Sequence, residues 1–243
     1  MSRRRLGLLL WLAGMAGVAS FALLPLPPTM AATATNVPLW LVQAIGLGQS
    51  GLVLAVAVGI GTRLAPSVDL AAPVFEAVAA RRGAWHALRP QLVPGLVGAL
   101  LGGLVLLLFR QRAPSAIHSA VAGGFDPSLL VRVLYGGVTE ELLLRWGAMT
   151  LLLWLFARGA RRRHARPGRL AAAAAIAGSA LLFGLGHLPT IVAYGGTLST
   201  DVVAWTLAGN GLFGVLTGIL FRRYGLEAAM LAHGLAHVAA FLA

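Results

Sequence analysis

The stretch VTEELLLRW, residues 138–146, places two adjacent carboxylates and one guanidinium inside a long apolar segment. The surrounding residues 129–156 are otherwise apolar, apart from one other arginine and a few uncharged polar side chains. A charged side chain at the centre of a membrane helix costs at least about 2.5–3.5 kcal/mol. Three such groups within six residues, Glu140, Glu141 and Arg145, therefore predict a functional site. The simpler alternative is a buried ion pair that only holds helices together.

The spacing of these three groups assigns them different surroundings. On a helix, Glu141 and Arg145 are four residues apart and can pair on one face. Glu140 lies about 100° further round the helix axis, so its carboxylate can point elsewhere. Two carboxylates in unlike environments can divide their roles, one staying charged while the other takes up a proton. We therefore expect Glu141 to be paired and Glu140 to be free for proton transfer.

The composition of the whole chain predicts a polytopic membrane protein. The 243 residues are 58% hydrophobic and only 11% charged, whereas soluble domains carry about 25% charged residues. We expect an all-α, polytopic transmembrane helix bundle that forms one integral membrane domain. The absence of cysteine excludes disulfide and thiol chemistry. All nineteen basic residues are arginine, and this bias suggests a GC-rich bacterial genome and hence the bacterial inner membrane.

Seven apolar segments approach or exceed the roughly 20 residues that a membrane-spanning helix needs. They cover residues 6–25, 39–61, 91–109, 127–157, 170–187, 201–221 and 226–243. The fourth segment is longer than a bilayer is thick. It is expected to be tilted, kinked near Gly136 and Gly137, or divided into two, which would give eight spans instead of seven.

Prolines and small residues predict how these spans end and pack. Pro189 is expected to end the fifth span, because proline does not normally continue a helix. Gly98 with Gly102, and Gly214 with Gly218, are small-residue pairs that let another helix approach closely. In the polar connection 62–90, the spacing of the apolar residues Val74, Phe75, Val78 and Trp85 predicts an amphipathic helix at the membrane interface.

The arginines predict the orientation of the chain. The N-terminus and the connections 62–90, 158–169 and 222–225 carry arginine, whereas of the other connections, 26–38, 110–127 and 188–200, only 110–127 carries any. By the positive-inside rule, the N-terminus is cytoplasmic. The first apolar run could be a signal peptide, but the spans that follow favour an uncleaved helix. The net charge of +12 comes mainly from these short clusters, and no basic groove suggests a nucleic-acid partner.

Three of the six histidines fall inside predicted spans, in FGLGH at residues 183–187 and HGLAH at residues 233–237. Each costs insertion energy unless it meets the glutamates in a shared polar cavity. Such a cavity suits three chemistries. A glutamate could act as general base on water, with histidines donating hydrogen bonds to an oxyanion. His187, His233, His237 and a glutamate could bind zinc, although the HEXXH spacing is absent. Glutamate and histidine could also form a proton relay in a transporter, but no inverted repeat is visible.

Three motifs occur in order, each on its own span: Glu140-Glu141-x-x-x-Arg145, Phe183-x-x-x-His187 and His233-x-x-x-His237. Together they resemble the CPBP family of CAAX proteases and bacteriocin-processing (Abi) enzymes. The run from Gly211 through Arg222-Arg223 to His233 also resembles the approach to that family's last motif. The resemblance covers about residues 128–242. It divides the chain into N-terminal transmembrane helices with an interfacial segment, residues 1–125, and a catalytic core, residues 126–243.

The resemblance implies a metal-independent, intramembrane glutamic endopeptidase without a cofactor. It implies that Glu140 activates water together with His187 and that His233 and His237 hold the oxyanion. Glu141, Arg145 and Phe183 would support this site. The expected partners are the lipid bilayer and a peptide or membrane-protein substrate. We do not expect this substrate to carry the prenyl group found on the substrates of eukaryotic relatives. The family usually has asparagine where this chain has His237, which favours the alternative of a non-catalytic, partner-binding or immunity protein.

Overall fold

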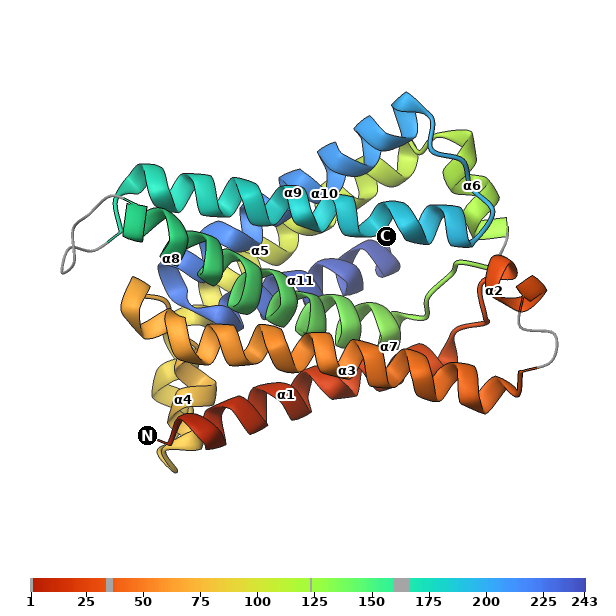
Figure 1. Cartoon of the computed structure of the whole chain (residues 1–243). Coiled ribbons are helices and arrows are strands. Elements are labelled where there is room, and N and C mark those ends of the chain that lie inside the picture. The colour runs from red at the N-terminus through yellow and green to blue at the C-terminus, as the bar shows by residue number, and fades with distance from the viewer. Residues whose placement is uncertain (1, 34–36, 123, 160–166) are drawn as a thin grey trace.

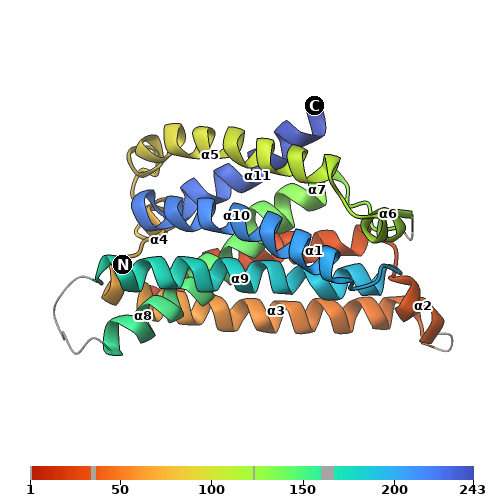
Figure 2. The same cartoon turned by 90° about the horizontal axis from the view of Figure 1, so that it is seen from above.

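The chain folds into a bundle of long helices that run roughly along one direction (Figures 1 and 2). The computed structural model describes residues 2–33, 37–122, 124–159 and 167–243, and these ranges contain helices and no strand. The long helices are α1 (Arg3–Ser20), α3 (Leu39–Leu64), α5 (Trp85–Gln111), α9 (Arg169–Ala193), α10 (Thr200–Tyr224) and α11 (Leu226–Leu242). The short ones are η1 (Phe21–Leu23), α2 (Pro28–Thr33), η2 (Ala65–Val68), α4 (Pro73–Ala79) and α6 (Ser115–Ala122).

The helix that carries the opening stretch is continuous but changes its winding. It begins as α7 (Leu129–Val131) and passes through two π-helical segments, η3 (Arg132–Glu140) and η4 (Leu142–Met149). It then ends as α8 (Thr150–Gly159). π-Helical turns are rare and occur frequently at functional sites. The irregularity expected near Gly136 and Gly137 is thus a change of helical winding within one helix. The arginine cluster predicted at 158–169 lies mostly outside the described residues.

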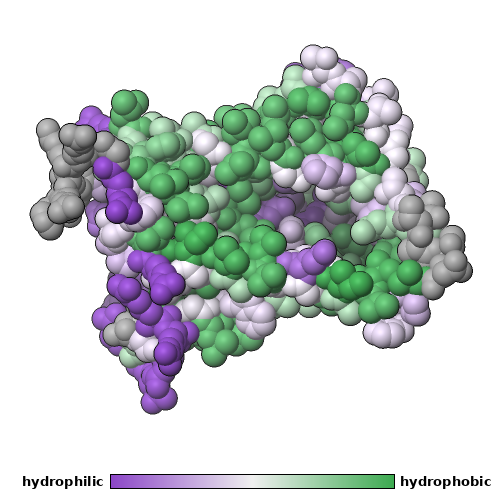
Figure 3. Space-filling model, in the orientation of Figure 1, coloured by the Kyte–Doolittle hydropathy of each residue, from purple (hydrophilic) through white to green (hydrophobic). Residues whose placement is uncertain are grey.

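The length and the apolar character of the helices show that the chain is an integral membrane protein. Five helical segments among the described residues are long and apolar enough to cross a membrane, and α11 is an apolar helix just below that length. With the helix 129–159, these elements are compatible with seven spans. Figure 3 shows that the flanks of the bundle are mostly hydrophobic, whereas the end near the N-terminus is hydrophilic.

Two expectations about helix ends are wrong. Pro189 lies inside α9, which continues to Ala193. Proline removes one N–H donor and displaces one carbonyl, but the amides that follow it can still form helical hydrogen bonds. The helix ends instead where Gly195 adopts a left-handed φ of 87°. The third long helix begins at Trp85 and not near residue 91, so the interfacial helix is only α4.

The predicted small-residue pairs lie at helix–helix contacts. A Cβ atom on Gly98 would come within 2.9 Å of the Ala232 Cβ on α11, and one on Gly102 within 3.1 Å of the Ala236 Cβ. A Cβ atom on Gly214 would come within 2.9 Å of the Ala180 Cα on α9. The small residues therefore allow α5 to pack closely on α11, and α10 on α9, as predicted.

A buried carboxylate that the sequence reasoning did not single out joins α4 to the bundle. Glu227, at the start of α11, accepts hydrogen bonds from the backbone amides of Val74 and Phe75 at 2.8 and 3.0 Å. Its second oxygen accepts a 3.2 Å hydrogen bond from Gln91 Nε2, and Gln91 Oε1 accepts one from the Ala228 amide at 2.9 Å. Glu227 therefore satisfies the first amides of α4, which have no partner within that helix.

Replacing Glu227 by alanine is expected to loosen α4 before it affects the rest of the bundle. The change leaves two backbone amides and the Gln91 amide without their acceptor, at a cost of about 1–3 kcal/mol for each buried group. Limited proteolysis of the purified protein should show faster cleavage within residues 69–84. Glu227→Gln keeps one acceptor oxygen and should give an intermediate rate. Equal cleavage of all three proteins would contradict this role.

Candidate active site

Close contacts fix the position of the η3 segment between α1 and α11. Thr139 donates a 2.7 Å hydrogen bond to the carbonyl oxygen of Gly14 on α1. On the other side, a Cβ atom on Gly137 would come within 2.9 Å of the Gly234 Cα on α11. Because glycine meets glycine at this contact, the backbones approach closely. The two glutamates that follow are therefore held beside the histidines of α11.

Glu141 and Arg145 form a fully buried ion pair, as their spacing predicts. Both side chains are 0% exposed, and Arg145 Nε lies 3.2 Å from Glu141 Oε2, although the two atoms are not aligned for a hydrogen bond. Arg145 Nη2 donates to the carbonyl oxygen of Gly214 at 3.1 Å and also to the Thr217 hydroxyl. Sequence reasoning did not find Thr217 as a partner, although it is a polar residue inside an apolar span. These contacts on α10 orient the guanidinium, which in turn orients Glu141.

Glu140 lies apart from this pair and faces two imidazole rings. Its side chain is 17% exposed. Glu140 Oε1 is 4.0 Å from His187 Nε2, and Glu140 Oε2 is 3.8 Å from His233 Nε2. These distances are too long for direct hydrogen bonds, but one water molecule can bridge polar atoms at such separations. The carboxylate and the two rings thus surround a position suited to a water molecule.

The second nitrogen of each of these two rings has a partner. His187 Nδ1 lies 2.8 Å from the carbonyl oxygen of Phe183. A carbonyl only accepts hydrogen bonds, so Nδ1–H donates and Nε2 of the neutral ring is an acceptor. His233 Nδ1 lies 2.8 Å from Glu141 Oε1, and the charged carboxylate likewise accepts. His233 Nε2 can therefore donate a hydrogen bond only when that ring carries both protons.

His237 completes the cluster one helical turn beyond His233. The two rings are stacked, with centroids 5.2 Å apart. A Cβ atom on Gly136 would lie 3.1 Å from His237 Nε2 and 3.3 Å from His233 Nε2, so both nitrogens face the same space beside that glycine. Gly136 precedes Glu140 by four residues. The sequence predicted it only as a kink, and its spacing from Glu140 is the signal that could have placed it at the site.

Aromatic rings cover the rest of the cluster. The Phe183 ring lies edge-on to His187, with centroids 4.8 Å apart, and 5.0 Å below the Arg145 guanidinium. Phe213 of α10 packs on His233 at 4.6 Å. Phe213 was not predicted. These rings exclude water from the ion pair, which strengthens its electrostatic interaction.

The cluster is accessible from one face of the bundle. The side chain of His187 is 34% exposed. Figure 3 shows a hollow in the apolar surface, between α9 and the helix 129–159, and hydrophilic residues line its interior. In the parts of the chain that the structure describes, no three His, Asp or Glu side chains are grouped so as to hold a metal ion. The hollow thus joins a polar site inside the bundle to the hydrophobic flank of the protein.

The structure brings together all seven residues that the sequence selected, from three separate helices. They are Glu140, Glu141, Arg145, Phe183, His187, His233 and His237. Such a cluster of ionisable groups in a bundle interior is typical of a functional site.

Comparison with known proteins finds one family that matches part of the chain. Residues 124–239, just under half of the chain, match the family described as type II CAAX prenyl endopeptidase Rce1-like. No protein of curated function and no solved structure matches the chain. The matched residues include the whole cluster, and the family description supports a protease in the CAAX protease family that the three motifs resemble. Residues 124–239 of this integral membrane protein are therefore an Rce1-like domain.

Proposed function

We propose that the protein is an intramembrane endopeptidase that hydrolyses a peptide bond of a membrane-associated peptide or protein with water activated by Glu140. The observation that carries this proposal is the different environment of the two adjacent glutamates. Arg145 and His233 hold Glu141, whereas Glu140 is partly exposed and lies between two imidazole rings. The arginine pattern and composition support the inner membrane of a bacterium as the location.

The proposed reaction begins with proton transfer from water to Glu140. The water oxygen attacks the carbonyl carbon of the scissile bond, and the Glu140 carboxylate takes its proton as general base. His187, whose Nε2 is an acceptor in the neutral ring, orients the same water. The protonated Glu140 then donates to the leaving amine, the C–N bond breaks, and a carboxylic acid and an amine are formed. No covalent enzyme intermediate is needed.

In this proposal, His233 and His237 stabilise the negative oxygen of the tetrahedral intermediate. Both Nε2 atoms face the space beside Gly136, and donors directed at a developing oxyanion contribute strongly to catalysis. The Nε2–H that would donate from His233 to the oxyanion exists when this ring carries a proton on both nitrogens, because its Nδ1–H donates to Glu141. In this proposal, Glu141 and Arg145 position His233 and do not contact the substrate.

The helices before residue 126 serve as a scaffold in this proposal. Thr139, which directly precedes Glu140, is bound to Gly14 of α1. The catalytic core of residues 126–243 would therefore depend on α1 for the position of its general base.

Replacing His237 by asparagine is expected to preserve hydrolysis within about tenfold, because an amide N–H can also donate to the oxyanion. His237→Ala removes the donor and should lower the rate about 100-fold or more, as for the loss of one oxyanion donor. The measurement is cleavage of the substrate by reconstituted protein. Equal rates for His237→Ala and the wild type would remove His237 from the site.

Replacing Gly136 by alanine is expected to lower the rate about tenfold to 100-fold with little loss of stability. The added methyl group would lie 3.1–3.3 Å from the two imidazole nitrogens, where the substrate oxygen is placed in this proposal. Misplacement by about 1 Å can cost about 100-fold. Gly168→Ala is a suitable control, because a Cβ atom there meets no other atom within 4 Å. Unchanged cleavage by Gly136→Ala would contradict this placement.

N-terminal profiling tests the proposed activity itself. Membranes from a bacterial host that expresses the protein are compared with membranes from the same host without it. New N-termini that persist when a metal chelator is present would support a glutamate-dependent endopeptidase. Loss of the new N-termini with chelator, and their return with zinc, would instead favour the metal-dependent alternative. Identical profiles at good expression would favour a partner-binding protein.

A further inference from the structure

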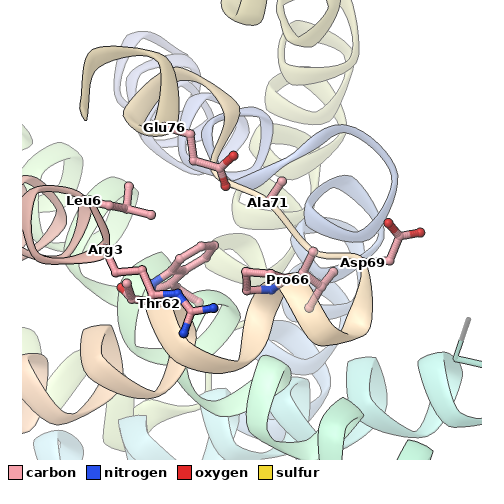
Figure 4. Close-up of a pocket in the computed structure, with 9 residues that line it drawn as sticks. Arg3, Leu6, Thr62, Pro66, Asp69, Ala71 and Glu76 are labelled. Atoms are coloured by element: carbon pink, nitrogen blue, oxygen red, sulfur yellow. The ribbon is translucent and has the colours of Figure 1, made fainter. Parts of the chain in front are cut away.

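A second cavity lies at the polar end of the bundle, away from the Glu140 cluster. It has a volume of about 340 Å³ and lies between the start of α1, the end of α3 and the segment that leads into α4 (Figure 4). Its lining includes Arg3, Leu6, Thr62, Asp69, Glu76 and Trp146 and none of the seven clustered residues. Ligand sites in proteins have volumes of about 300–1,000 Å³, so this cavity can hold a small polar group.

Two buried polar groups in the cavity wall have no partner among the described residues. Thr62 is 7% exposed and Trp146 is 1% exposed. The Thr62 hydroxyl and the Trp146 Nε1–H make no hydrogen bond with the described protein. A Cβ atom on Gly61 would come within 2.5 Å of Trp146 Nε1, so α3 holds the indole ring firmly in place. Buried polar groups are nearly always paired, so a bound molecule is expected to supply the missing acceptor.

Three charged side chains line the cavity and indicate what kind of molecule it can bind. Arg3 adds a cationic donor beside Thr62 (Figure 4), and three donors together suit the oxygens of a phosphate. Glu76 carries a carboxylate across the cavity, whereas the carboxylate of Asp69 points away from Arg3 and Thr62 (Figure 4). Its Oε1 accepts the Ala72 amide at 3.1 Å, and a carboxylate has further acceptor sites for an ammonium group. The cavity therefore suits a group that carries a phosphate and an amine together.

The position of the cavity points to a lipid as the source of this group. Helix α1 begins at Arg3, and α3 ends at Leu64, so the cavity lies where two spans leave the bilayer. Hydrophilic surface gathers at this end (Figure 3), and phospholipid headgroups occupy the same level. Leu6 gives the cavity an apolar edge. We propose that the cavity binds the headgroup of an aminophospholipid, with Arg3, Thr62 and Trp146 donating to the phosphate and Glu76 accepting from the amine.

Binding of a soluble aminophospholipid tests this proposal without requiring protease activity. Dihexanoyl phosphatidylethanolamine is titrated into the purified full-length protein in detergent, and complexes are counted by native mass spectrometry. The wild type should form a saturable one-to-one complex. Arg3→Gln and Thr62→Val should each weaken it about tenfold or more, as expected for lost hydrogen bonds to a charged group. Arg4→Gln removes the same charge from a residue that does not line the cavity and should bind like the wild type.

Competition distinguishes the sources of the phosphate. Dihexanoyl phosphatidylglycerol, which lacks the amine, should bind at least about fivefold more weakly, and inorganic phosphate should not compete at equal concentration. Competition by inorganic phosphate would overturn the lipid in favour of a free phosphate. Equal loss of binding in Arg3→Gln and Arg4→Gln, or no loss in Arg3→Gln and Thr62→Val, would overturn the site itself. Arg3 is exposed at a helix start, so Arg3→Gln remains decisive if Thr62→Val fails to fold.

Discussion

Glu140→Gln is expected to lower the rate of peptide hydrolysis by at least about 100-fold and up to about 10,000-fold, the range attributed to general acid–base catalysis. Glutamine has nearly the same shape as glutamate but cannot take the proton from water. The measurement is cleavage, by protein reconstituted in vesicles, of the substrate identified by N-terminal profiling. The effect should appear in kcat, because the proton transfer occurs in the transition state.

The fold should tolerate this change. Glu140 is partly exposed and lies 3.8–4.0 Å from its nearest imidazole nitrogens, so the amide replaces no direct hydrogen bond or close ion pair of this carboxylate. Asp126→Asn is the matched control, since it also converts a carboxylate to an amide but lies at an exposed pair with Arg132. Both variants should melt like the wild type, and only Glu140→Gln should be inactive. Cleavage by Glu140→Gln within threefold of the wild type would assign the general base to another group.

Arg145→Ala is expected to destabilise the protein by about 3–5 kcal/mol, because breaking a buried pair leaves an uncompensated charge. Glu141 would keep only His233 as a partner in a site that is 0% exposed. The carbonyl of Gly214 and the hydroxyl of Thr217 would also lose their donor. Low expression and a lower melting temperature of the purified protein are the expected results, so this variant is unsuitable as a catalytic test.

Two further variants separate the charge effect from lost packing. Arg132→Ala removes a partly exposed arginine that pairs with the exposed Asp126 and donates to the carbonyl oxygen of Pro127, so it should cost clearly less than Arg145→Ala, at about 1–2 kcal/mol. The double variant Glu141→Gln with Arg145→Met removes both charges and keeps side-chain volume. It should be clearly more stable than Arg145→Ala, since neutral replacements of a buried pair are often tolerated. Equal instability of the single and double variants would show that packing, and not the unpaired charge, causes the loss.

Local spacing in the sequence determined the class of fold and predicted the residues that the structure brings together in the polar cluster. Apolar runs of bilayer length identified the helices, because the cost of exposing backbone polar groups to lipid leaves few alternatives. Four-residue spacing identified the Glu141–Arg145 pair. The same insertion cost made Glu140, His187, His233 and His237 conspicuous in apolar segments.

Only the tertiary structure decided which of these residues meet, and how. Nothing in the spacing of residues 138–146 shows that His233 donates to Glu141, or that Thr217 and Gly214 receive Arg145. These contacts join the helix 129–159 to α10 and α11, which lie 69–92 residues further along the chain, and close packing at glycines brings the helices together. The same holds for Glu227, whose carboxylate caps α4 about 150 residues earlier in the chain. The sequence shows which polar side chains lie on each helix. Only the packing of the helices against one another decides which donor atom and which acceptor atom come within hydrogen-bond distance.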